Sequence, residues 1–158
     1  MNFDKYNNNG MKDKVGLHGK INILHFRNGM QINELNVNNL VPTVGKAQVA
    51  GLIMGGVSQA FTALAIGTGT AAPAAGDTAL TAQAGVRASA TSTRETTTVT
   101  NDTAQLVATF SFNAASAVTE AGIFDIAAAG TPLTHATFAA INVGSGDSLQ
   151  LTYQAIVG

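Results

Sequence analysis

Residues 148–157 read SLQLTYQAIV, and this stretch decides the fold. Its apolar side chains stand at every second position, opposite polar ones, which is the period of a half-buried β-strand. Residues 104–112 (AQLVATFSF) repeat the alternation, with Leu106 and Phe110 on the apolar side. Each stretch offers one face to a core and a more polar face outward, which predicts antiparallel sheets.

Working outward, similar segments recur at roughly the 8–12-residue spacing of sandwiches and barrels. Thr, Val, Phe and Ile dominate them, as strands favour. We expect strands at 61–66, 86–92, 96–100, 104–112, 118–126, 133–138 and 148–157. The sequence therefore predicts a mainly β protein, an antiparallel β-sandwich of jelly-roll or immunoglobulin-like type.

A hairpin and a helix are expected before this region. Residues 21–26 alternate and run into Asn28-Gly29, a strong hairpin turn signal because both residues tolerate positive φ. Residues 30–37 suit the returning strand. Thr43 is a candidate N-cap for a short helix over 44–60. Its apolar stripe, at spacings of three and four, would comprise Val49, Leu52, Ile53, Val57 and Phe61.

The chain divides into a tail and a domain. Residues 1–14 are polar and rich in Asn and Lys, which predicts an extended, flexible N-terminal arm. Residues 15–158 suit one β-rich domain, made of a hairpin (15–44), a helix (45–60) and a sandwich (61–158). The charge-free stretch 47–76 is interrupted by polar residues, Gly and Pro, so we expect no membrane span.

The composition favours assembly over catalysis. Charged residues are 11% of the chain, well below the roughly 25% of an ordinary globular protein. A surface so poor in charge is suited to being covered by partner subunits. With no cysteine and a net charge of −1, thiolate chemistry is excluded and a nucleic-acid footprint is not expected.

One charge stands out inside an apolar strand. Glu120 lies in the stretch 118–124 (VTEAGIF), and a buried carboxylate needs a partner such as Arg87 or backbone amides. Catalysis is the less favoured interpretation, because Glu120 and Asp125 would point to opposite faces of a strand. The sequence also lacks a Gly-x-Ser-x-Gly elbow and a phosphate-loop lysine.

The remaining polar residues suggest structural roles. The histidines, His18, His25 and His135, have no metal-ligand spacing and are interpreted as solvated or strand-face residues, so no metal or cofactor is expected. Asp77 and Asp147 each precede a hydroxyl residue in a predicted turn, where such side chains bond nearby amides. Gly67 and Gly69 are expected to let the chain turn sharply after its strand.

Several short motifs together suggest a family. They are residues 65–70 (AIGTGT) with Pro73, residues 77–80 (DTAL), 118–124 (VTEAGIF), 130–133 (GTPL), and Phe138 through 146–149 (GDSL). Over residues 61–158 this pattern resembles tailed-bacteriophage virion proteins, of tail-fibre, collar and capsid-decoration type. The resemblance implies multimers, often trimers, on a virion particle assembled in the cytoplasm of a bacterial host.

These observations fit three classes of function to different degrees. The favoured one is a virion structural protein that forms homo-oligomers and docks on a major capsid, tail or collar protein, with no membrane or nucleic-acid partner. The alternative is a carbohydrate-binding sandwich acting as an adhesin, for which few aromatic residues are available. An enzyme is the least supported.

Overall fold

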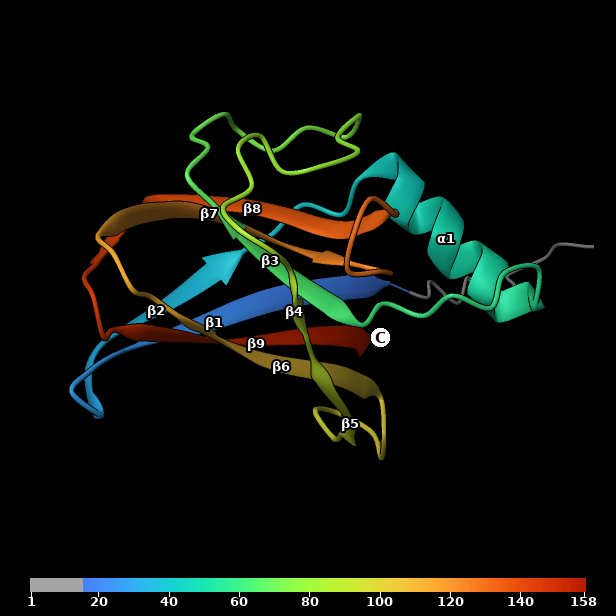
Figure 1. The fold of residues 1–158 in the computed structure, drawn as a ribbon. Helices are drawn as coiled ribbons and strands as arrows, with labels where there is room; N and C mark the ends of the chain where they lie inside the picture. Colours follow the sequence, from blue (N-terminus) through green and yellow to red (C-terminus); the bar gives the residue numbers. More distant parts are fainter. Residues whose placement is uncertain (1–15) are drawn as a thin grey trace, which may run out of the picture.

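The computed structural model describes residues 16–158, which form two antiparallel sheets and one helix (Figure 1). The predicted tail, residues 1–14, lies outside the described residues. Sheet A has the strand order β2-β1-β9-β6-β5, and sheet B has the order β4-β3-β7-β8. The elements are β1 (Leu17–Arg27), β2 (Met30–Asn38), α1 (Thr43–Met54), β3 (Ala63–Gly67), β4 (Ala88–Ser89), β5 (Thr91–Glu95), β6 (Thr103–Ser111), β7 (Ser116–Phe124), β8 (Pro132–Val143) and β9 (Ser148–Val157). The predicted mainly β sandwich is confirmed.

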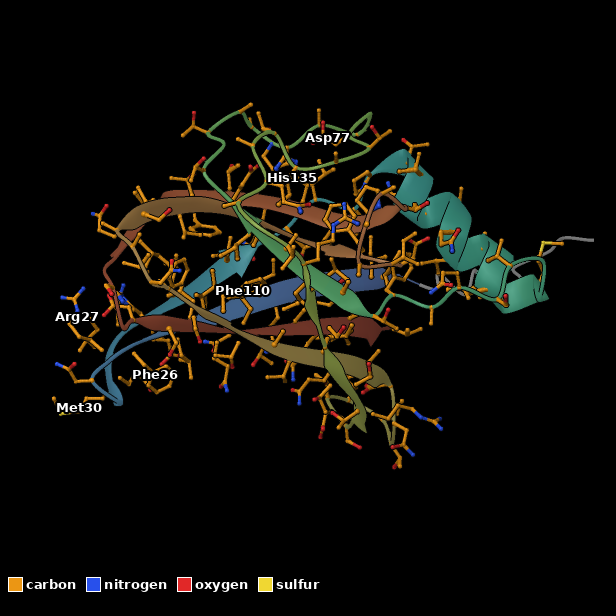
Figure 2. The ribbon with its side chains drawn as sticks, viewed as in Figure 1. Phe26, Arg27, Met30, Asp77, Phe110 and His135 are labelled. Carbon is orange, nitrogen blue, oxygen red and sulfur yellow. The ribbon has the colours of Figure 1, made fainter. Side chains whose placement is uncertain are left out.

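The stretch that decided the fold lies at the centre of sheet A. β9 pairs with β1 on one side and with β6 on the other. Its residues Leu149, Leu151 and Tyr153 are buried, and the corresponding side of β6 contributes Leu106 and Phe110 to the same core. Phe110 points between the two sheets in Figure 2. Burial of alternate residues is therefore what holds this strand in register.

The N-terminal hairpin is also confirmed. Asn28 and Gly29 join β1 to β2 with φ angles of 51° and 75°, the positive values that a two-residue hairpin turn of this kind requires. The register between β1 and β2 is uniform from Asn38 back to Asn33, and a bulge then follows at Ile32.

Connecting segments cross between the sheets at both edges of the sandwich. At one edge, Leu40 exchanges backbone hydrogen bonds with His135 of β8. At the other, β4 and β5 are separated only by Ala90, so one extended segment leaves sheet B and joins sheet A. Figure 1 shows this segment crossing in front of the sheets. The sandwich is thus partly closed on both sides.

The helix differs from its prediction in three ways. Pro42, not Thr43, occupies the N-cap position, and no side chain caps it. The helix ends at Met54 rather than near residue 60, because Gly55 adopts φ 70° and terminates it. The predicted apolar stripe is a core face only in part, since Val49 and Phe61 pack against the core whereas Ile53 is 80% exposed. At 12 residues, α1 is too short to cross a membrane, and no other described helix does so.

The predicted strand at 96–100 is wrong. This segment is a loop organised by Asp102, whose carboxylate accepts the N–H groups of Thr97, Thr98 and Val99 at 2.7–2.9 Å. These bonds hold the pKa of Asp102 well below its usual range. The Thr-rich sequence favours a strand locally, but a side chain that satisfies three successive amides favours a loop.

The two outer faces of the sandwich are unlike each other. The segment 68–87, called here the covering loop, passes over the outer face of sheet B (Figure 1). Beneath it Leu80 packs on Ala63, Ala65 and Phe124 in a small second core. The outer face of sheet A has no such cover among residues 16–158, and its side chains are half-buried or exposed apart from Thr103.

Candidate functional site: a buried acid–imidazole cluster beneath the covering loop

Glu120 of β7 points outward from sheet B into the covering loop. Its side chain is fully buried and accepts four hydrogen bonds. Oε1 accepts the N–H groups of Gly69 at 3.0 Å and Ala82 at 2.6 Å. Oε2 accepts the N–H of Thr81 at 2.9 Å and lies 3.0 Å from Nε2 of His135. Since a carboxylate has about four acceptor positions, all of them are occupied within the protein.

His135 of β8 lies between two carboxylates. Its Nε2 contacts Glu120, and its Nδ1 lies 2.6 Å from Oδ2 of Asp77 in the covering loop. Figure 2 shows Asp77 and His135 directed toward each other beneath the loop. Both contacts of the ring are with carboxylate oxygens, which only accept hydrogen bonds. The imidazole therefore bridges the covering loop to sheet B.

The surroundings keep both carboxyl groups ionised. Burial alone raises the pKa of Glu120, but the amides of Ala82, Thr81 and Gly69, together with His135, outweigh it and the pKa is lowered. The pKa of Asp77 is lowered by the N–H of Ala74 and by His135. Hydrogen bonds to the charged form are the dominant cause for both groups.

The glycines of the predicted turn serve a different purpose from the one expected. A Cβ atom at Gly69 would stand 2.6 Å from Oε1 of Glu120, and one at Gly67 would stand 2.5 Å from the carbonyl oxygen of Ala82. Neither glycine has a positive φ angle. These positions are thus glycine because the carboxylate and the returning backbone approach closely, not because the chain turns sharply there.

The sequence offers two kinds of partner for Glu120, and the structure shows one of them. Backbone amides are its partners, as expected, but Arg87 is not. The guanidinium of Arg87 lies over the ring of Phe124, 3.4 Å from its centre, and donates to the carbonyl oxygens of Ile126 and Ala129. Arg87 therefore fastens the end of the covering loop to the turn after β7, at a distance from the carboxylate.

A second buried acid lies at the end of sheet A where β1 finishes and β9 begins. Asp147, in the turn before β9, is predicted as a turn residue and does accept the N–H of Gly144 at 2.8 Å. It also accepts two hydrogen bonds from Arg27, at 2.9 and 2.7 Å, and contacts His25 at 2.9 Å. The bidentate Arg27 contact is the first cause of the lowered pKa of Asp147. This cluster ties the end of β1 to the β8–β9 turn.

The sequence interpretation missed the two partner histidines. Both are buried strand residues. His135 contacts Asp77, 58 positions away in the sequence, and His25 contacts Asp147, 122 positions away. One signal was available for His135. The Gly130 turn folds β7 onto β8, and the resulting register sets Gly122 opposite His135, two residues from Glu120 on the same face. No comparable local signal links His25 to Asp147.

The described surface also contains shallow grooves. One mainly apolar groove, about 450 Å³, lies between α1 and the ends of β1 and β9 and is lined by Leu17, Val49 and Ile53 among others. In residues 16–158 no three His, Asp or Glu side chains are arranged to hold a metal ion. Nothing matches this chain among protein-family models, curated proteins or solved structures.

This arrangement anchors a loop. Three of the four acceptor contacts of Glu120 go to the covering loop, and the fourth goes to a histidine that binds Asp77 of the same loop. The carboxylate is buried and its lone pairs are filled, so it fixes the loop backbone at three positions. A buried network of this kind makes the loop a rigid outer layer of sheet B.

Proposed function

We propose that the protein is a self-assembling structural component of a tailed-bacteriophage virion, which docks on a capsid, tail or collar protein as a decoration or short fibre element. The observation that carries the proposal is the set of large apolar side chains left at the surface of a chain with only 11% charged residues. Exposed apolar groups in such a setting favour contact with another protein surface.

Four of these side chains form two pairs, while others such as Val86 and Val99 lie elsewhere on the surface. Met30 and Ile32, 67% and 48% exposed, stand at the start of β2 next to the hairpin turn, and Figure 2 shows Met30 near Phe26 at the hairpin tip. Ile53 and Met54, both 80% exposed, lie at the end of α1 beside the apolar groove. Two separate apolar regions suit a protein that touches both its own copies and a second component.

The polar interior supports the same proposal. The buried acids and histidines are paired with one another, with Arg27 or with backbone amides, and these pairings hold loops and turns in place. A rigid sandwich with fastened loops is suited to repeated packing in a particle. The resemblance of residues 61–158 to virion proteins is the reason for proposing a virion as the particle. It also implies trimers as the oligomeric state.

The test is the mass of the purified protein and its binding to particles. We expect multimers in sedimentation velocity at micromolar concentration, and co-sedimentation with phage capsids or tails that lack the protein. Mass spectrometry of intact virions then gives the copy number, with hundreds of copies for capsid decoration and about six to eighteen for a tail or collar. A protein that is monomeric and binds neither particle contradicts the proposal.

A further inference from the structure

The sandwich formed by residues 16–158 has four edge strands, and three of them are protected. β4 has two residues and continues directly into β5. β5 has five residues and carries the charges of Arg94 and Glu95. β8 is paired by Leu40 at His135, and its register with β7 is interrupted between Thr137 and Ile141. Short length, charge, coverage and irregularity are the features by which edge strands avoid pairing with other chains.

β2 lacks most of these features. It has nine residues and contains no Lys, Arg or Pro, with Glu34 as its one charged residue. Among residues 16–158 it pairs with β1 alone. The segment Asn33–Asn38 is regular against β1, and the bulge at Ile32 lies outside it. β2 therefore presents an edge of regular register with one charge, next to the exposed Met30 and Ile32.

The direction of its free backbone groups follows from one contact. The N–H of Glu34 donates to Oδ1 of Asn33 at 2.9 Å, so it does not bond to β1. In an antiparallel pair the residues alternate between bonding to the partner strand and facing away from it. Asn36 and Asn38 accordingly direct their N–H and C=O groups to the free edge, as Glu34 does.

We propose that β2 pairs antiparallel with β2 of a second copy across a two-fold axis, which joins the two five-stranded sheets A into one continuous sheet. This inference rests on the proposed self-assembly and names its contact. An antiparallel edge is complementary to itself, since a two-fold axis brings each donor opposite an acceptor of the copy. Such a contact makes dimers, and a three-fold contact would need a different surface.

The charge of Glu34 selects the register. With Glu34 on the axis, two carboxylates would stand opposite each other, which is destabilising. With Asn36 on the axis, Asn36 faces its own copy and Glu34 faces Asn38. In the same register Leu35 faces Val37, so apolar side chains meet apolar ones. We therefore assign Asn36 to the two-fold axis.

The first test replaces Asn36 by lysine. Asn36→Lys puts two ammonium groups opposite each other at the centre of the contact, and we expect the dissociation constant to rise at least about tenfold. Thr93→Lys on the opposite edge strand β5 is the matched control, because it adds the same charge to another exposed strand. We expect the control to stay within about twofold of the natural protein, since surface substitutions change little. Unfolding curves of both variants check that each remains folded.

The second test uses the absence of cysteine from the chain. With Asn36→Cys, mild oxidation should give a disulfide-linked dimer, whereas Glu34→Cys and Asn38→Cys, which lie away from their own copies, should not. If cross-linking peaks at Glu34→Cys or at a cysteine placed at Thr93, the assigned contact is wrong.

The outcomes separate this inference from the proposed function. Multimers that Asn36→Lys leaves intact would overturn the β2 contact and keep self-assembly. A natural protein that stays monomeric at all concentrations would overturn both. Dimers that are lost in Asn36→Lys and retained in Thr93→Lys support both.

Discussion

The outer faces of sheets A and B carry polar contacts of nearly the same length, one exposed to solvent and one buried. On sheet A, Asn22 donates to Glu34 at 2.7 Å on an exposed surface. On sheet B, Glu120 accepts the N–H of Ala82 at 2.6 Å beneath the covering loop, where it is fully buried. Water competes for the first contact and cannot replace the second. Distance alone therefore does not tell which carboxylate matters for stability.

The two sheets also differ in whether their polar groups find partners within the chain. Sheet B is finished within the chain, because the covering loop supplies the amides that its buried carboxylate needs. Sheet A ends at β2 with backbone groups directed outward. The outer face of sheet B is thus covered within the chain, whereas sheet A ends in the β2 edge that we propose pairs with a second copy.

The largest expected effect comes from removing the charge of Glu120. In Glu120→Gln the side-chain NH₂ faces backbone N–H groups that lose their acceptor, and we expect the free energy of unfolding to fall by about 3–5 kcal/mol. Glu34→Gln, the matched change on the open face, should alter it by less than about 0.5 kcal/mol. Urea unfolding measures both. Equal losses in the two variants would contradict the distinction between the faces.

A smaller effect is expected from crowding the carboxylate. Gly69→Ala sets a methyl group 2.6 Å from Oε1 of Glu120, and overpacking of this kind costs about 1–3 kcal/mol. Gly76, in the same loop, has no atom within 4 Å of its would-be Cβ and no positive φ angle. Gly76→Ala should therefore change stability by less than about 0.5 kcal/mol. A Gly76 variant as unstable as the Gly69 variant would argue against close approach as the reason for Gly69.

The outer member of the cluster should matter less. Asp77 is partly exposed, and Asp77→Asn should cost about 1 kcal/mol while speeding amide exchange in the covering loop. Asp102→Asn is the control, since it should loosen residues 96–102 and leave the covering loop unchanged. Hydrogen exchange followed by mass spectrometry distinguishes the two patterns. Faster exchange of the covering loop in the Asp102 variant would contradict the assignment of Asp77 as the residue that holds this loop.

Acidification gives the smallest difference. Asp77 and Glu120 have pKa values below those of the unfolded chain, so their contribution to stability is present above about pH 4 and is lost as the pH falls through the folded values. Asp102 and Asp147 act in the same direction. Glu120→Gln lacks one of these groups, so its unfolding free energy should depend less steeply on pH below 4. An identical slope in the variant and the natural protein would exclude Glu120 as a source of the acid effect.

Much of the fold could be predicted because its signals are local. The alternation in 148–157 and the Asn28-Gly29 turn each act over a few residues, and both elements form as expected. The conformation of the segment 96–100 could not be predicted in this way, because it depends on the carboxylate of Asp102 rather than on the strand propensity of the segment. The helix end was not predicted because the apolar spacing continues to Phe61, while the left-handed conformation of Gly55 ends the helix at Met54.

The candidate site was predicted only in part, for a related reason. A lone Glu120 in an apolar strand signals a buried acid, whatever the topology. Its actual partners come from a loop 38 to 51 positions away, and which segment crosses that face is a property of the whole sandwich. Arg87 was a sound partner by charge, but the fold places it over Phe124.

The central claim is that sheet B is closed within each chain and that β2 of sheet A is closed only by another copy. Amide hydrogen exchange on dilute and on concentrated protein tests it most directly. We predict that residues 68–87 are protected equally in both samples, and that residues 33–38 gain protection only in the concentrated one. Protection of 68–87 that appears only on association, with residues 33–38 unchanged, would contradict the account.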